Sequence, residues 1–178
     1  MSDEMKIEKI AKYLHESHAS KSRFQNLVGE LAPDSVLDAY KVQKALNRLW
    51  EQGGRGTVAG YKIALTSKAI QELVGVDKPV GAAIFSSTVH QSPAKIELDQ
   101  FVRLGLEFEI AFEIAEDIPK NSHYDAESVG AFVKAIMPAF ELIEDRDADY
   151  SNLDPMTLIA DNAWCGGCLL YTSDAADE

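Results

Sequence analysis

The stretch from Leu104 to Ile114, LGLEFEIAFEI, places an apolar residue at every even position and glutamates at three of the odd ones. A period of two is typical of a β-strand, whose successive side chains point to opposite faces. Glu107 and Glu109 would therefore project from one face, close enough together for both to reach one small cation. A half-buried antiparallel strand with an acidic outer face gives the same pattern, so the rest of the chain must decide between the two readings.

Length and charge limit the possible classes of protein. The chain has 178 residues, is 46% hydrophobic and carries a net charge of -12, which fits a globular domain that repels nucleic acid and anionic membrane surfaces. No apolar run approaches the roughly 20 residues that a membrane helix needs, and the N-terminus, MSDEMKIEKI, lacks an apolar signal segment. We expect a cytoplasmic protein. A small anionic substrate can still bind where a metal or a lysine inverts the local charge.

Residues 1–56 are predicted to form a helical arm. The first helix covers about residues 3–18, with an apolar stripe at Ile7, Ile10, Ala11 and Leu14. His15 and His18 lie three residues apart near its end, and we expect them on a polar solvent face rather than on a metal. The second helix begins at a cap at Asp34 or Ser35, and ends near Gln52 before two glycines.

From residue 57 onward short β-branched runs alternate with turn residues, which indicates a mostly β region. Strands are predicted at 58–64, 83–89, 104–115 and 140–143. Helices are predicted at 67–74, at 125–135 and from Asp154-Pro155 onward, where aspartate and proline suit the first positions of a helix. Met137-Pro138 is expected to end the helix at 125–135. Residues 57–167 thus read as one continuous domain behind the arm.

Two further residues extend the acidic strand into a candidate site. Glu141 lies alone among apolar residues in the strand at 140–143, where a buried carboxylate needs a partner. Glu107, Glu109 and Glu141 together would form a hard oxygen site suited to Mg²⁺ or Mn²⁺, although Glu141 by itself also fits a surface position. Lys62, in the strand at 58–64, could face this cluster and orient an acid group or move a proton; most strand lysines point into water.

Three other features have weaker signals. Thr66 and Ser67 follow a strand and precede a helix, where backbone N–H groups bind anions or simply form a cap. Cys165 and Cys168 form CGGC, but no further ligands for zinc and no thioredoxin-like pattern lie nearby, so the spacing is taken as incidental. Residues 168–178, CLLYTSDAADE, look like a translated sequencing adapter and are expected to be non-native. A short, disordered acidic tail is the alternative.

Four motifs in order resemble the 2-keto-4-pentenoate hydratases of the fumarylacetoacetate hydrolase superfamily. They are GYKIALTSKAIQ followed by VGVDKP, then LEFEIAFEI, MPAFELIEDR and LIADNA, and the resemblance covers about residues 34–167. It implies an α+β fold in which the helical arm precedes the mixed β-sandwich roll of this superfamily, with the C-terminal strands of the roll missing. It also implies a homo-oligomer.

The resemblance assigns roles to individual residues. Glu107, Glu109 and Glu141 match the metal ligands, and Lys62 matches the lysine beside the substrate. The backbone around Leu65 and Thr66 would help to hold the substrate carboxylate. Asp161 and Asn162 match a pair expected to line or support the pocket. Val80 and Trp164 depart from the family pattern, which has an acidic residue and a small serine there, so the pocket is expected to differ in shape.

The resulting hypothesis is an enzyme, a hydro-lyase of aromatic catabolism. With Mg²⁺ or Mn²⁺ it would hydrate a 2-hydroxy-2,4-dienoate to a 4-hydroxy-2-oxo acid. Decarboxylation of a 2-oxo-enedioate or hydrolysis of an acylpyruvate are alternatives on the same site; the former calls for an additional basic residue, and the latter for a Glu-His pair that we do not find. An inactive fragment, or a subunit that supports a pathway enzyme, is the non-enzymatic alternative.

Overall fold

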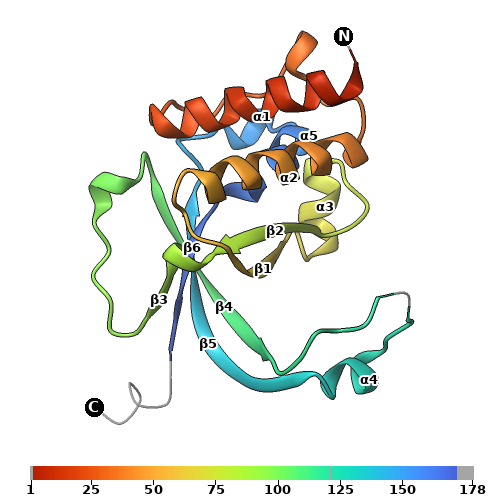
Figure 1. Cartoon of the computed structure of the whole chain (residues 1–178), viewed down its shortest axis with the longest axis vertical. Helices are drawn as coiled ribbons and strands as arrows, with labels where there is room; N and C mark the ends of the chain where they lie inside the picture. The colour runs from red at the N-terminus through yellow and green to blue at the C-terminus, as the bar shows by residue number, and fades with distance from the viewer. Residues whose placement is uncertain (1, 121, 172–178) are drawn as a thin grey trace.

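The computed structural model describes residues 2–120 and 122–171 (Figure 1). Two long helices, α1 (Asp3–Ala19) and α2 (Val36–Gln52), lie side by side at one end of the molecule, with α5 (Pro155–Ala160) packed on α2. The side chain of Ser35 accepts a hydrogen bond from Asp38 N and caps α2, as predicted. Asp154 caps α5 in the same way, with Pro155 at its first position.

A small sheet lies below the helices. It consists of β1 (Val58–Ala64) and β2 (Val80–Phe85), which pair antiparallel and are connected through α3 (Lys68–Val74). Ser67 caps α3 by accepting a hydrogen bond from Ile70 N. The strand predicted at 83–89 begins earlier than expected and ends at Phe85, because a single 3₁₀ turn at 86–88 redirects the chain into the next strand.

The larger sheet has four strands in the order β3-β6-β5-β4. They are β3 (Val89–Gln91), β6 (Cys165–Leu170), β5 (Val133–Glu144) and β4 (Leu104–Ile114). The antiparallel pair β4 and β5 forms a long ribbon that extends away from the helices, with β4 at the edge of the sheet (Figure 1). The predicted strand at 104–115 is therefore confirmed to within one residue.

The prediction for residues 125–135 was wrong over most of its length. The helix expected at 125–135 is only α4 (Ala126–Gly130), and β5 begins at Val133. Asp125 does cap α4, as predicted, but Pro138 lies inside β5, opposite Ile110, instead of ending a helix. The predicted helix does not continue to residue 135, because the chain pairs with β4 from Val133 onward.

The main apolar core joins the helices to the small sheet. Its buried members include Ile10 and Leu14 of α1, Val42 and Leu46 of α2, and Phe85 of β2. Residues 1–56 thus share a core with the elements that follow them. The division of the chain at residue 56 stays a prediction.

The apolar face of the ribbon is open in the described structure. Phe108 is 87% exposed, Ile110 64% and Phe112 56%, so the alternation of 104–114 separates an acidic face from an apolar face that the described residues leave uncovered. Large exposed apolar patches of this kind usually mark surfaces that contact other polypeptide.

The C-terminal part of the described chain belongs to the larger sheet. Residues 168–170 belong to β6, where they pair with β3 and β5, which differs from the disordered tail considered above. Residues 172–178 lie outside the described residues, and the adapter origin of 168–178 stays a prediction. Within the described residues, no helix combines the length and hydropathy that a membrane span requires.

Candidate metal centre

The three predicted metal ligands meet on one face of the ribbon. One carboxylate oxygen each of Glu107, Glu109 and Glu141 lies within 4.8 Å of the others. The strand register explains this arrangement: Glu107 is directly opposite Glu141 in the β4–β5 ladder, and Glu109 is two residues further along β4 on the same face. Glu107 and Glu109 are exposed, whereas Glu141 is buried.

Lys62 reaches this cluster from the small sheet. Its Nζ lies 2.6 Å from Oε1 of Glu141, and the two side chains are 11% and 7% exposed. Within the described residues, the Lys62 ammonium is the group that faces this buried oxygen, and no other donor hydrogen-bonds to it. The strand lysine therefore points at the carboxylates, as the functional reading of the sequence requires.

The electrostatics of the cluster favour an additional positive charge. Burial raises the pKa of the Glu141 carboxyl group above its ordinary value, the ammonium of Lys62 opposes this, and the nearby charges of Glu107 and Glu109 raise the pKa further. Three crowded carboxylates beside a single lysine form a hard oxygen donor set. This set fits a divalent cation such as Mg²⁺ or Mn²⁺.

Leu65 and Thr66 follow β1, close in sequence to Lys62. Leu65 adopts a left-handed backbone with φ of 57°, and its carbonyl accepts a hydrogen bond from Nε2 of Gln71. Thr66 is exposed. Among the described residues, no hydrogen bond joins either one to the three glutamates, so a contact of their backbone with a substrate carboxylate stays a proposal.

Asp161 lies in a buried ionic network. It is fully buried, and its two carboxylate oxygens lie 2.6 Å from Nε2 of His18 and 2.6 Å from Nη2 of Arg146. Burial acts to raise the pKa of Asp161, but His18 and Arg146 outweigh it and lower the pKa below its ordinary value. Both carboxylate oxygens of Asp161 are thus engaged within this network, and its role in lining or supporting the pocket stays a proposal.

Two partners in this region were missed or misplaced by sequence reasoning. The sequence predicted His18 on a solvent face, and this was wrong. Its ring packs edge-on against Trp50 and contacts Asp161. Arg146 was not identified as a candidate from the sequence. It is buried beside Asp161, and the two opposite charges compensate each other. His18 and Asp161 are 143 positions apart, and a pair at such a separation leaves no local pattern in the sequence.

The two cysteines of the CGGC sequence lie in β6. Both are free and buried, and burial raises the pKa of the Cys165 thiol to about 12, which keeps it protonated and unreactive. The three glutamates are the one group of potential metal ligands that comes together in the described residues. The interpretation of CGGC as incidental spacing stays a prediction.

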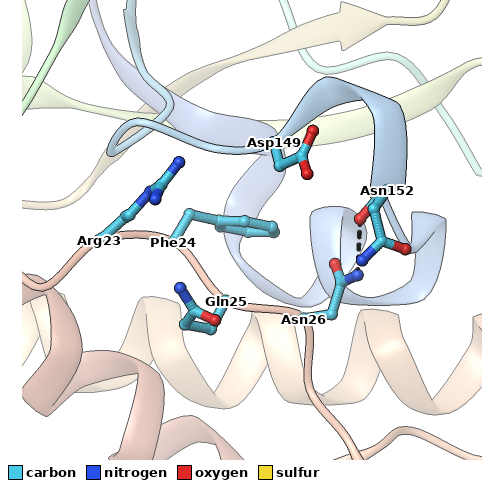
Figure 2. A pocket seen from close by; sticks show the side chains of 6 residues that line it. All are labelled: Arg23, Phe24, Gln25, Asn26, Asp149 and Asn152. Carbon is cyan, nitrogen blue, oxygen red and sulfur yellow. Dashed lines mark hydrogen bonds between the residues drawn. The ribbon is translucent and has the colours of Figure 1, made fainter.

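A separate polar hollow lies between the segment at 23–26 and the turn at 149–152 (Figure 2). It is lined by Arg23, Phe24, Gln25, Asn26, Asp149 and Asn152, and includes none of the candidate site residues. Trp164 packs edge-on against Phe24 with the ring centroids 5.2 Å apart. The tryptophan that departs from the family pattern is thus in contact with the residues around this hollow.

Several known hydratases are similar to the chain in sequence. No protein-family model matches the chain. It is 31% identical to a 2-keto-4-pentenoate hydratase of Burkholderia vietnamiensis over 92% of this chain and 61% of the relative. It is 30% identical to a 2-hydroxyhexa-2,4-dienoate hydratase of Comamonas testosteroni, over 93% of this chain and 62% of the relative. A 2-oxo-hept-4-ene-1,7-dioate hydratase of Escherichia coli is also 30% identical, over 90% of this chain and 61% of the relative.

Solved structures show the same fold. Two structures of 4-oxalocrotonate decarboxylase from Pseudomonas putida G7, one with calcium and acetate and one with magnesium and adipate, superpose with TM-scores of 0.80 and 0.81. They are 20% and 21% identical to the chain, and the match covers 96% of this chain and 62% and 63% of theirs.

The chain therefore has the fold of these decarboxylase structures. This agrees with the α+β fold that the resemblance to the fumarylacetoacetate hydrolase superfamily implies. In sequence, the chain is similar to 2-keto-4-pentenoate hydratases and to a 2-hydroxyhexa-2,4-dienoate hydratase. It spans about three fifths, 61%, of the length of the curated relatives that it matches first.

Proposed function

We propose that Glu107, Glu109 and Glu141 hold one divalent cation and that the protein takes part in the hydration of a 2-hydroxy-2,4-dienoate to a 4-hydroxy-2-oxo acid in aromatic catabolism. The observation that carries this proposal is the convergence of the three carboxylates beside Lys62. The names of the curated relatives, which are hydratases of dienoates and related oxo acids, support the reaction type.

The cation supplies a Lewis acid that binds oxygens of the substrate and stabilises negative charge as it develops on them. The ligands on β4 are exposed, so a small acid can approach the site from that face. Lys62 would orient the substrate's acid group or carry a proton, because its ammonium is held at the cluster by Glu141. Leu65, Thr66 and Asp161 would complete the site, the first two through their backbone and Asp161 through support.

A decarboxylase is the second candidate on the same site. It is favoured by the fold neighbours, which are named 4-oxalocrotonate decarboxylases, one of them with the dicarboxylate adipate. A dicarboxylate substrate calls for an additional basic residue in the pocket. The sequence relatives favour hydration, so it stays the main proposal.

The test is an assay of the chain against a panel of 2-hydroxy-2,4-dienoates and 2-oxo-enedioates, with and without Mn²⁺ or Mg²⁺. Dienoate absorbance should fall only with the cation, and Glu109→Gln should lower turnover by at least about a hundredfold. The matched control is Glu113→Gln on the same strand. Because Glu113 is paired with Lys134, this substitution should leave turnover unchanged. Release of CO₂ from an enedioate without dienoate hydration would favour the decarboxylase.

Three further properties belong to the proposal. A homo-oligomer, a location in the cytoplasm and association with a pathway enzyme are expected by resemblance to the hydratases. Turnover by the 178 residues alone is also a proposal, because the relatives are longer. Cation binding without any turnover would indicate that this chain is an inactive fragment or a supporting subunit.

A further inference from the structure

The candidate centre combines side chains from two separate sheets. Lys62 comes from β1 of the small sheet, whereas Glu107, Glu109 and Glu141 come from the larger one. The distance between the lysine and the carboxylates therefore depends on what holds the two sheets together near the site. Asn162 is the residue that stands at this junction.

The side chain of Asn162 binds the free edge of β2. It is fully buried; its Oδ1 accepts a hydrogen bond from Ala83 N at 2.9 Å, and its Nδ2 donates one to Ala83 O at 2.8 Å. The amide thus occupies the backbone groups that a neighbouring strand would otherwise use. Ala83 lies next to Ala82, the residue directly opposite Lys62 in the β1–β2 ladder.

The other end of this link is the larger sheet. Asn162 opens a single turn that leads directly into β6, the strand whose Cys168 is paired with Glu141. Through Asn162, the backbone beside Lys62 is therefore connected to the backbone beside Glu141. Asparagine is suited to this position because it tolerates the left-handed conformation, with φ of 55°, better than most residues.

The turn itself is held in a costly conformation. Ala163 and Trp164 also have positive φ, of 44° and 58°, and non-glycine residues adopt such angles only where surrounding contacts enforce them. Those contacts are the two bonds of Asn162 to β2 and, one residue earlier, the ion pairs of Asp161 with His18 and Arg146. The turn is fixed from both sides.

We propose that Asn162 is a positioning residue that holds Lys62 against Glu141 by joining the two sheets. The proposal deepens the proposed function, since Lys62 and Glu141 are expected to act there. The structural contact that it explains is the 2.6 Å ion pair, which can be measured without cation or substrate. A failure of this inference can therefore be told apart from a failure of the proposed activity.

The experiment measures the coupling free energy between Lys62 and Glu141, with and without the two hydrogen bonds of Asn162 to Ala83. A double-mutant cycle is measured by urea unfolding in the absence of metal. It compares the unsubstituted chain, Lys62→Met, Glu141→Gln and the double variant. The same cycle is then repeated with Asn162→Gly added to all four proteins. Glycine is chosen because it accepts the positive φ, so that the two hydrogen bonds are removed without added backbone strain. Coupling should amount to about tenfold in the unfolding equilibrium constant with Asn162, and fall to less than about twofold with glycine.

Asn26→Gly is the matched control. Asn26 also bridges two backbone groups, donating to Asn152 O and accepting from Asp154 N, but it lies at the polar hollow (Figure 2). Its loss should lower stability and leave the coupling of Lys62 and Glu141 unchanged. Coupling that stays at its full value in Asn162→Gly overturns the proposal.

A second variant covers the case in which Asn162→Gly does not fold. Asn162→Asp keeps the acceptor for Ala83 N and loses the donor to Ala83 O, so the coupling should again fall below that of the unsubstituted chain. Undiminished coupling in this variant would equally contradict the proposal that Asn162 positions Lys62 against Glu141.

Discussion

Lys62 and Glu141 form the buried ion pair on which the candidate centre depends. Removing one partner of a buried pair leaves an uncompensated charge, so Lys62→Met should cost about 3 kcal/mol of unfolding free energy at neutral pH. The loss should shrink as the pH falls, because burial already raises the pKa of Glu141 and the lone carboxyl then takes up a proton. Urea unfolding between pH 5 and about 8 measures both effects, and a loss that is independent of pH would contradict this reading.

Asp161 predicts a different dependence on pH. Its pKa in the folded chain is lowered below the ordinary 3.8, so its charge stabilises the fold above that value, and this contribution is lost as the pH falls through the lower folded pKa. Asp161→Asn should be less stable than the unsubstituted chain at neutral pH, and the gap should narrow below pH 3.8. The comparison is made by urea unfolding at several acidic pH values. A gap that widens with acidification would show that Asp161 is not held as an ion.

Sequence reasoning found the acidic and basic side chains that local periodicity exposes. The alternation of residues 104–114 placed Glu107 and Glu109 on one face. Glu141 and Lys62 were singled out as lone charges in predicted strands, and the family motifs then assigned their roles. It did not find the contact of His18 with Asp161 or the bonds of Asn162 to Ala83, which span 143 and 79 positions. Such contacts depend on how the elements pack, and single-sequence patterns do not contain that information.

Helices and strands with strong local signals were predicted closely, and those fixed by pairing were not. The helix caps at Ser35 and Asp154 and the alternation of β4 define those elements within a few residues. In contrast, the start of β5 at Val133 depends on its partner strand. β6, with two adjacent glycines and no alternation, gave no strand signal and forms between β3 and β5.

The cap of α5 gives a direct test at the level of one element. Oδ2 of Asp154 accepts hydrogen bonds from Thr157 N at 2.8 Å and Thr157 Oγ1 at 2.6 Å. Asp154→Ala should therefore cost about 1 kcal/mol of unfolding free energy, whereas Asp154→Ser, which can still cap, should cost less. Equal losses in the two variants, measured by urea unfolding, would show that the cap does not stabilise α5.

The molecule as a whole has an apolar face that is not covered by described residues. The sequence indicated the alternation in β4, but not that its apolar side would lie open on a protruding ribbon (Figure 1). An edge strand with such a face promotes association between chains. The arrangement of two sheets under a helical layer came from resemblance to a family rather than from periodicity, because periodicity does not specify which strands meet.

Phe108→Lys tests the consequence for association. Phe108 is 87% exposed at the centre of the apolar face, so a charge there should raise the protein concentration at which light scattering first appears. Val28→Lys is the control, since Val28 is 72% exposed but lies outside the ribbon. An equal effect of the two substitutions would indicate that net charge, and not the ribbon face, controls association.

The central claim is that Glu107, Glu109 and Glu141 bind one divalent cation. Titration of the chain with Mn²⁺, followed by the loss of the free-ion signal in electron paramagnetic resonance, tests it most directly. We predict one site per chain that is lost in Glu109→Gln and retained in Glu113→Gln, whose glutamate lies on the same strand and pairs with Lys134 at 2.6 Å. Equal Mn²⁺ binding by both variants, or no binding by the unsubstituted chain, would contradict the account.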